Sequence, residues 1–248
     1  MESIARSAYQ AYLEFLSKGS ANVKNLFLKN VSSLLIENKN EILKENKKDI
    51  EQGKKDGLTQ AVLDRIMLSE ERIKNMSRAC LEIADLPDPI GKMDSIEKRP
   101  QGFTLGKIRT PIGVIGMIYE ARPNVTIEAA ALCLKSGNAV ILRGGSSFYH
   151  SNHALLKILK EACNMSGLNS NLVSHLPSQD KSLVQEMLAL DKWIHLIIPR
   201  GGASFIQYVK ENSKIPVLKH DRGLCHLYVH KDADVASAVK IADNSKNQ

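Results

Sequence analysis

Residues 139–147 read Ala-Val-Ile-Leu-Arg-Gly-Gly-Ser-Ser, and this stretch decides the fold. Four apolar residues are typical of a short buried strand, and Arg143 marks its carboxyl end before two glycines interrupt it. A second stretch of the same type, Leu-Ile-Ile-Pro-Arg-Gly-Gly-Ala-Ser, occupies residues 196–204. Each stretch leads into a segment with helical periodicity. Two strand–glycine–helix junctions of this kind predict βα units around a parallel sheet.

The segments around these two junctions continue the same alternation. Short apolar runs alternate with amphipathic stretches, at spacings that suit the crossovers of a parallel sheet. The expected strands are 112–118, 139–142, 172–173 and 193–198, and the expected helices are 123–134, 149–163, 181–190 and 203–210. The sequence therefore predicts an α/β fold over residues 112–230, with a Rossmann-like, mostly parallel sheet and flanking helices.

The residues before this region have a different pattern. Up to about residue 86 the apolar positions repeat at helical spacing, and Ser69 precedes two glutamates as an expected N-cap. Residues 1–95 are therefore expected to be helices that pack on the α/β domain. The stretch 37–56 is rich in Lys and Glu with balanced charge, which predicts a solvated helix. Residues 96–111 contain an alternating segment and are expected to form a protruding strand arm or an edge strand.

Composition and charge restrict the function classes. The chain has 248 residues and a net charge of +7, and the excess lies in residues 98–119 and 192–222, which contain few aromatic residues. This distribution favours a small anionic ligand over nucleic acid. The sequence contains no apolar run long enough for a membrane helix and no secretory signal, so a cytoplasmic protein with no membrane partner is expected. The four cysteines have no close spacing, so neither a disulfide framework nor a metal site is expected.

The two glycine junctions indicate a phosphorylated ligand. Glycine lets a phosphate approach the backbone, the following helix offers free N–H groups, and arginine adds a bidentate donor. Two tight turns without a ligand are the alternative. The sequence contains neither a P-loop nor the G-x-G-x-x-G fingerprint. Residues 144–160 contain no Asp or Glu, and a carboxylate there would repel a 2′-phosphate, so Arg143 and this absence favour NADPH over NADH.

Three further residues are candidates for chemistry. Asn124 follows another strand end, where its amide is expected either to stabilise an oxyanion or to cap the next helix. Cys225 and His226 are sequence neighbours, and neighbours in an extended segment point to opposite faces. Cys225 is therefore expected to be a packed residue at the start of the apolar strand 227–229 rather than a nucleophile. His195 is expected to be a core histidine.

A longer block of sequence resembles a known family. Residues 113–126 read Gly-Val-Ile-Gly-Met-Ile-Tyr-Glu-Ala-Arg-Pro-Asn-Val-Thr, which is similar to the signature block of the γ-glutamyl phosphate reductase family. That family belongs to the aldehyde dehydrogenase superfamily. The blocks at 107–113, 139–145, 196–202 and 225–229 fit the same family in order and spacing. The resemblance covers essentially the whole chain.

The resemblance implies an activity. In this family NADPH reduces L-glutamyl 5-phosphate to L-glutamate 5-semialdehyde and phosphate is released, a step of proline biosynthesis. A cysteine thiolate forms an acyl-enzyme, which divides one difficult displacement into two steps. The family also implies functional coupling to glutamate 5-kinase, and a homo-oligomer assembled through the strand arm when the protein is full length. A non-catalytic nucleotide-binding fragment, or another acyl reductase of the superfamily, remains the alternative.

The resemblance also assigns roles to individual residues. Asn124 matches the family's oxyanion-stabilising asparagine. The loop that meets the adenosine ribose is matched by Arg143, Gly144, Gly145 and Ser146, and the turn that meets the diphosphate is matched by Arg200, Gly201 and Gly202. Ser146 falls where relatives that prefer NAD have Glu. The superfamily's general base falls near His220 and is not retained, and Arg222 stands where a small residue is expected.

The family's nucleophile has no match within the chain. It lies in a block resembling Asn-x-Lys-x-Gln-Arg-Pro-x-x-Cys-Asn, and residues 244–248 read Asn-Ser-Lys-Asn-Gln. The nucleophilic cysteine is therefore expected just beyond Gln248, with 231–248 as the truncated start of a catalytic domain. The chain alone is expected to be inactive.

Overall fold

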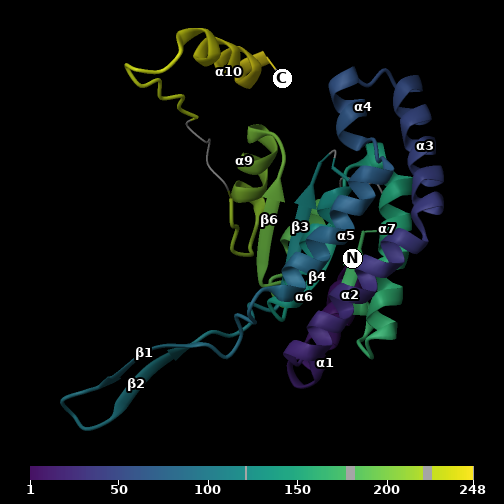
Figure 1. Cartoon of the computed structure of the whole chain (residues 1–248). Coiled ribbons are helices and arrows are strands. Elements are labelled where there is room, and N and C mark those ends of the chain that lie inside the picture. Colours follow the sequence, from purple (N-terminus) through teal and green to yellow (C-terminus); the bar gives the residue numbers. More distant parts are fainter. Residues whose placement is uncertain (121, 177–181, 220–224, 248) are drawn as a thin grey trace.

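A computed structural model describes residues 1–120, 122–176, 182–219 and 225–247 (Figure 1). The N-terminal helices come first, a hairpin follows, and the remaining elements alternate between strand and helix. The elements are α1 (Glu2–Lys18), α2 (Ala21–Glu37), α3 (Lys39–Lys55), α4 (Gln60–Ile66), α5 (Glu70–Asp85), β1 (Met93–Lys98), β2 (Thr104–Ile108), β3 (Val114–Tyr119), α6 (Asn124–Lys135), β4 (Ala139–Arg143), η1 (Ser146–Phe148), α7 (Tyr149–Met165), η2 (Ser170–Leu172), β5 (Val173–His175), α8 (Ser182–Leu188), β6 (Leu196–Arg200), α9 (Ala203–Asn212) and α10 (Val235–Asn247).

The central sheet has four parallel strands in the order β5-β4-β3-β6. The chain runs from β3 outward through β4 to β5, and then returns to the other side of β3 as β6. The direction of winding therefore reverses between β3 and β6, and ligands of open parallel sheets bind at the carboxyl ends of the strands beside such a reversal. The predicted α/β fold with a parallel sheet is confirmed.

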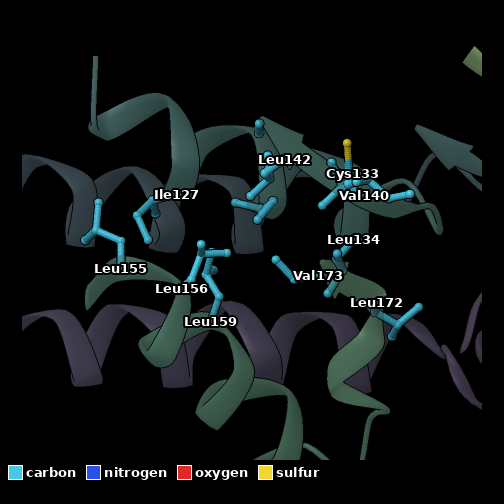
Figure 2. Packing of buried hydrophobic residues seen from close by; sticks show 14 of the residues in the cluster. Ile127, Cys133, Leu134, Val140, Leu142, Leu155, Leu156, Leu159, Leu172 and Val173 are labelled. Atoms are coloured by element: carbon cyan, nitrogen blue, oxygen red, sulfur yellow. The ribbon is translucent and has the colours of Figure 1, made fainter. Parts of the chain in front are cut away.

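The core lies on both faces of the two central strands, β3 and β4. Every residue of β4 before Arg143 is fully buried, as a continuous apolar strand between two helical layers requires. Figure 2 shows Ile127 of α6, Leu142 of β4 and Leu159 of α7 in the same cluster. This cluster also includes Phe27 of α2 and Ala8 of α1, so the N-terminal helices and the sheet share one core.

The N-terminal helices behave largely as their sequence predicts. The Ser69 hydroxyl accepts a hydrogen bond from the backbone N–H of Arg72, so Ser69 caps α5 as expected. The prediction of a solvated helix over residues 37–56 is wrong in part. Asn46 and Asp49 of α3 are only 3% exposed, because this face of α3 packs against the start of α7. A charge-rich sequence hides such contacts, since most of its charged side chains do face water.

The strand arm is a two-stranded hairpin. β1 and β2 pair in antiparallel register and project away from the body of the molecule (Figure 1). The segment is therefore an arm and not an edge strand of the main sheet. The sequence indicated β2 but not its partner β1, because β1 is almost wholly exposed and carries no alternating apolar pattern.

The residues after 224 differ from expectation. Residues 225–230 form no strand, and Tyr228 is 82% exposed. The prediction that Cys225 begins a packed strand is therefore wrong, and its side chain is exposed. The apolar run 227–229 has no strand pairing in the described part of the chain, and pairing is what an apolar run needs to become a strand. Within the described residues, every helix is too short or too polar to cross a membrane.

Candidate functional site

The two glycine junctions meet at the carboxyl edge of the sheet. β3 lies between β4 and β6, with Ile118 paired to Arg143 on one side and Tyr119 paired to Arg200 on the other. The junction after β4 and the junction after β6 therefore flank the end of β3. The sequence-predicted residues after each strand are brought to one edge, beside the reversal in winding.

The first junction rests on a buried polar network. The hydroxyls of Tyr119 and Thr126 lie 2.7 Å apart, and the Tyr119 hydroxyl donates to the Asn152 side-chain carbonyl over 3.1 Å. Burial raises the pKa of Tyr119 above its ordinary value. A Cβ on Gly144 would lie 2.7 Å from the Asn152 amide nitrogen and 3.0 Å from the ring of Phe148. Gly144 is thus required for packing against this network.

The helix after the first junction is capped from outside its own segment. Asp49 of α3 accepts hydrogen bonds from the backbone N–H groups of His150 and Ser151, over 3.0 and 2.7 Å. Burial raises the pKa of Asp49, although these hydrogen bonds oppose the rise. The N-terminus of α7 therefore already has an internal carboxylate, which uses two of its free donors. Sequence reasoning missed Asp49, and nothing in residues 37–56 distinguishes it from the exposed acids around it.

The second junction is open. Gly202 is the N-cap of α9, no side chain caps this helix, and a Cβ on Gly202 would meet nothing within 4 Å. A Cβ on Gly201 would lie 3.0 Å from the Glu120 carboxyl group, which is an exposed side chain. Arg200 is exposed at the end of β6. The first N–H groups of α9 are therefore available to an anion that approaches over Gly201.

Two charged groups lie between the junctions. Arg143 is partly buried at the end of β4, and burial lowers the pKa of its guanidinium while the Glu120 carboxylate acts in the opposite direction. No role for Glu120 is predicted from the sequence. Gly145 precedes the short helix η1, and Ser146, its first residue, is exposed. The edge thus presents two guanidiniums, a hydroxyl and one carboxylate to solvent.

Asn124 is the first residue of α6, but it does not cap that helix. Pro123 holds the N-cap position, and the Asn124 Nδ2 group donates to Glu128 Oε1 over 2.9 Å, one turn further along. The capping alternative is therefore wrong, and the second N–H of the amide is left for another acceptor. Asn124 and Arg122 line a cleft of about 390 Å³.

The other candidate residues lie away from this edge or outside the residues that the structure describes. His195 is partly buried just before β6, where its Nδ1 accepts a hydrogen bond from the backbone N–H of Val114 and its ring stacks on Tyr9. This agrees with a packed histidine. His220 and Arg222 lie outside the described residues. Within residues 1–120, 122–176, 182–219 and 225–247, no cluster of three His, Cys, Asp or Glu side chains has the arrangement of a metal site.

Sequence comparisons match this chain along nearly its whole length. The Aldehyde dehydrogenase family matches residues 1–246. A γ-glutamyl phosphate reductase from Colwellia psychrerythraea is 51% identical over 192 residues, which are 77% of this chain and 46% of the relative. One from Thermodesulfovibrio yellowstonii is 47% identical over 234 residues, which are 94% of this chain and 56% of the relative. The chain thus spans about half the length of the curated relatives it matches.

Solved structures agree with the sequence comparisons. The γ-glutamyl phosphate reductase of Thermotoga maritima superposes with a TM-score of 0.89 at 36% identity, over 99% of this chain and 59% of that one. A propionaldehyde dehydrogenase of Rhodopseudomonas palustris shares the fold, with a TM-score of 0.65 at 15% identity over 88% of this chain and 46% of that one. The chain belongs to the aldehyde dehydrogenase family.

Proposed function

We propose that the whole protein reduces L-glutamyl 5-phosphate to L-glutamate 5-semialdehyde with NADPH and releases phosphate. The observation that carries this proposal is the convergence of the two Arg-Gly-Gly junctions on either side of β3, in a chain about half identical to relatives named γ-glutamyl phosphate reductase. This reaction would contribute a step of proline biosynthesis.

The residues at the sheet edge fit a phosphorylated dinucleotide. Gly201 leaves space that a side chain would fill, and α9 offers backbone donors without a side-chain cap. Arg200, Gly201 and Gly202 would therefore hold the diphosphate. Arg143, Gly144, Gly145 and Ser146 would hold the adenosine ribose and its 2′-phosphate, since a partly buried guanidinium beside a hydroxyl suits a dianion. When bound, the nicotinamide supplies the hydride.

Asn124 would stabilise the negative charge that develops on the acyl oxygen. Its amide is fixed by the hydrogen bond to Glu128, so one N–H is already oriented before substrate arrives. A donor that needs no reorganisation during the reaction is more effective than one that must be ordered. Asn124 would supply this positioning while a cysteine of the whole protein forms the acyl-enzyme.

The described cysteines other than Cys225 are unsuited to be that nucleophile. Cys80, Cys133 and Cys163 are all buried, and burial raises the pKa of each thiol to about 12. A thiol with such a pKa has almost no thiolate near neutral pH. The proposal therefore assigns the acyl-enzyme to a cysteine of the whole protein other than these three, and the 248-residue chain by itself is expected to give no turnover.

The test is an NADPH-oxidation assay on the chain extended to the length of its relatives. Glutamate 5-kinase supplies the acyl phosphate in the same vessel, because acyl phosphates hydrolyse readily. We expect NADPH oxidation that requires kinase, ATP and glutamate together. A folded, extended protein that oxidises no NADPH under these conditions would refute the assignment. The same proposal includes functional coupling to this kinase, and a homo-oligomer joined through the β1–β2 hairpin.

A second candidate is a nucleotide-binding module without catalysis. It is favoured by one observation, that this chain holds both glycine junctions whereas burial raises the pKa of its three buried thiols to about 12. Calorimetry of the 248-residue chain with NADPH and NADP⁺ measures binding directly. Binding by both the short and the extended protein, with turnover by neither, is the result that would favour this candidate.

A further inference from the structure

A cleft of about 390 Å³ lies between α4, α5 and the start of α6, next to the proposed acyl site. Three arginines and two acids are among its lining residues. They are Arg65, Arg72, Arg122, Asp64 and Glu128, and Asn124 lies at the same wall. The cleft is thus strongly polar and carries charges of both signs, which is unusual for a site that accepts an apolar ligand.

Only part of this charge is paired within the protein. Arg72 donates to the backbone carbonyls of Asp64 and Met67 over 2.6 and 2.5 Å, and its guanidinium lies 3.8 Å from the Asp64 carboxylate. In the described part of the chain, the guanidiniums of Arg65 and Arg122 have no carboxylate within ion-pair distance. Two cations in this cleft therefore have no carboxylate partner among the described residues.

Glu128 is the complementary group. Its side chain is partly buried between α5 and α6, and the negative charge contributes to the raised pKa of Cys80 on the facing helix. Oε1 accepts the hydrogen bond from Asn124, which is a neutral amide. Among the described residues no cation lies within ion-pair distance of Glu128, although three arginines share its cleft. One carboxylate oxygen is therefore left for a cationic donor.

We propose that this cleft binds the amino-acid end of the substrate, with the α-ammonium on Glu128 and the α-carboxylate on Arg65 and Arg122. The proposal rests on the proposed function, which gives the substrate a glutamyl group. A zwitterion supplies what the cleft lacks, one cation for the carboxylate and one anion for the guanidiniums.

The spacing along α6 agrees with this orientation. Asn124 and Glu128 are four residues apart, so their Cα atoms are separated by about one helical turn, roughly 6 Å along the axis. Two methylene groups separate the acyl carbon of a glutamyl group from its α-carbon, a span of about 4 Å when the chain is extended. The side chains converge, however, because Asn124 Nδ2 lies 2.9 Å from Glu128 Oε1. An acyl oxygen on the other N–H of Asn124 would therefore place the ammonium within reach of the second carboxylate oxygen of Glu128.

The strongest competing occupant is the phosphate group of the substrate, because guanidiniums also bind phosphate. A phosphate does not account for Glu128, whose negative charge would repel it at this position. The two occupants differ in the variants and ligands to which they respond, and the following measurements separate them.

The first experiment measures ligand affinity by calorimetry on the extended protein. L-glutamate is compared with glutarate, which lacks the α-ammonium, and with 4-aminobutyrate, which lacks the α-carboxylate. We expect L-glutamate to bind at least about tenfold more tightly than either analogue. Glu128→Gln should abolish the preference over glutarate, and the double variant Arg65→Gln, Arg122→Gln should abolish the preference over 4-aminobutyrate. Equal affinities for the three ligands in the unmodified protein would overturn the proposal.

Matched controls come from the same region. Glu82 and Arg78 are exposed residues of α5 that do not line the cleft. Glu82→Gln and Arg78→Gln should keep both ligand preferences. Should Glu128→Gln unfold, Glu128→Asp retains the charge and should retain the preference over glutarate. If a folded Glu128→Asp protein and the two control variants all lose the preference over glutarate, the preference does not depend specifically on Glu128 and the proposal is contradicted.

The second experiment uses the reverse reaction, in which semialdehyde and phosphate are separate substrates. The cleft variants should raise the KM for the semialdehyde about tenfold and leave the KM for phosphate unchanged. A rise confined to the phosphate KM would assign the cleft to phosphate and overturn the proposal. The two failures remain distinguishable. A protein that prefers L-glutamate but never oxidises NADPH refutes the proposed reaction, and a protein that turns over without this ligand preference refutes the cleft.

Discussion

The two Arg-Gly-Gly junctions have similar sequences, but the helix caps and the contacts of the glycine turns differ between them. After β4, the start of α7 is capped by Asp49, and the Gly144 turn packs on buried side chains. After β6, no side chain caps α9, and the nearest atoms to a Cβ on Gly201 belong to the exposed carboxyl group of Glu120. At the first junction a protein carboxylate accepts hydrogen bonds from the backbone N–H groups that begin α7. At the second junction we expect a ligand to bind the corresponding N–H groups of α9.

This difference suggests that the two junctions have different roles in binding the cofactor. A helix N-terminus that already has a carboxylate gains little from a second anion, whereas an uncapped one gains the full interaction. The first junction is then a rigid support whose specificity comes from side chains such as Arg143. The second junction is the one that binds through its backbone. Five predictions test this contrast, in order of decreasing effect.

Removing the internal cap should harm the first junction most. Asp49→Ala removes hydrogen bonds to the part-buried backbone N–H of His150 and to the buried backbone N–H and hydroxyl of Ser151. We expect the free energy of unfolding to fall by about 3 kcal/mol, measured by urea denaturation. Asp56→Ala, at an exposed position of the same segment, should change it by less than about 0.5 kcal/mol. Equal losses would show that the cap has no special importance.

The pH dependence of this effect follows from the raised pKa of Asp49. The folded state holds the proton more tightly than the unfolded state, in which the pKa is near its ordinary value of 3.8. The contribution of Asp49 to stability is therefore largest at low pH and declines as the pH rises through the interval between the two pKa values. The cost of Asp49→Asn should accordingly shrink as the pH rises above about 3.8, the ordinary pKa of the carboxyl group. A cost that grows with pH would contradict the raised pKa.

Adding a methyl group should separate the two turns. Gly144→Ala forces a contact with Asn152 and the buried ring of Phe148, so we expect a loss of about 1–3 kcal/mol in unfolding free energy. Gly201→Ala meets only the movable end of Glu120, so stability should stay within about 0.5 kcal/mol while NADPH affinity falls. Calorimetry and denaturation on the same samples measure both. If Gly201→Ala also leaves NADPH affinity unchanged, the second turn is not the backbone site.

The two arginines should differ in cofactor discrimination. Arg143→Ala should raise the Kd for NADPH about tenfold more than that for NADH, because only NADPH has the 2′-phosphate. Arg200→Ala should weaken both cofactors equally, because both contain the diphosphate. Equal losses for the two cofactors in Arg143→Ala would contradict the cofactor preference that we propose.

The smallest effect is expected at Glu120. Its carboxylate lies next to Gly201 and interacts electrostatically with Arg143, so an approaching diphosphate must displace it. Glu120→Gln should tighten the binding of both cofactors by about two- to threefold, as for an exposed charge pair. The effect should disappear at high salt, and weaker binding by the variant would show that Glu120 has a positive role.

The sequence predicts the elements that are buried on both sides and misses those that are not. β3 and β4 appear as continuous apolar runs because both of their faces are buried, and β6 appears as one although only alternate residues of it are buried. β1 is absent from the prediction because hairpin strands that face water need no apolar pattern. The opposite error occurs at residues 227–229, where a strand is predicted and none forms. An apolar run indicates that a segment needs burial, but it does not show which surface would bury it.

The candidate site divides in the same way. Arg143, Gly144, Arg200 and Gly201 were identified because glycine and arginine after a strand have a local meaning. Asp49 and Glu128 were not identified, because each acts across the fold or along one helix turn without a local signature. Tertiary contacts decide which of many similar acids are buried, and a single sequence does not contain that information.

The sharing of one core between α1, α2 and the sheet has a consequence for synthesis. The ribosome releases the N-terminal helices first, but the strands β3 and β4 that contact α1 begin only at Val114 and Ala139. Until these strands emerge, the apolar face of α1 that includes Phe15 has no partner from the sheet. Nascent chains in this interval expose surface that is prone to aggregation, so they are natural clients for chaperones that shield apolar segments at the exit tunnel.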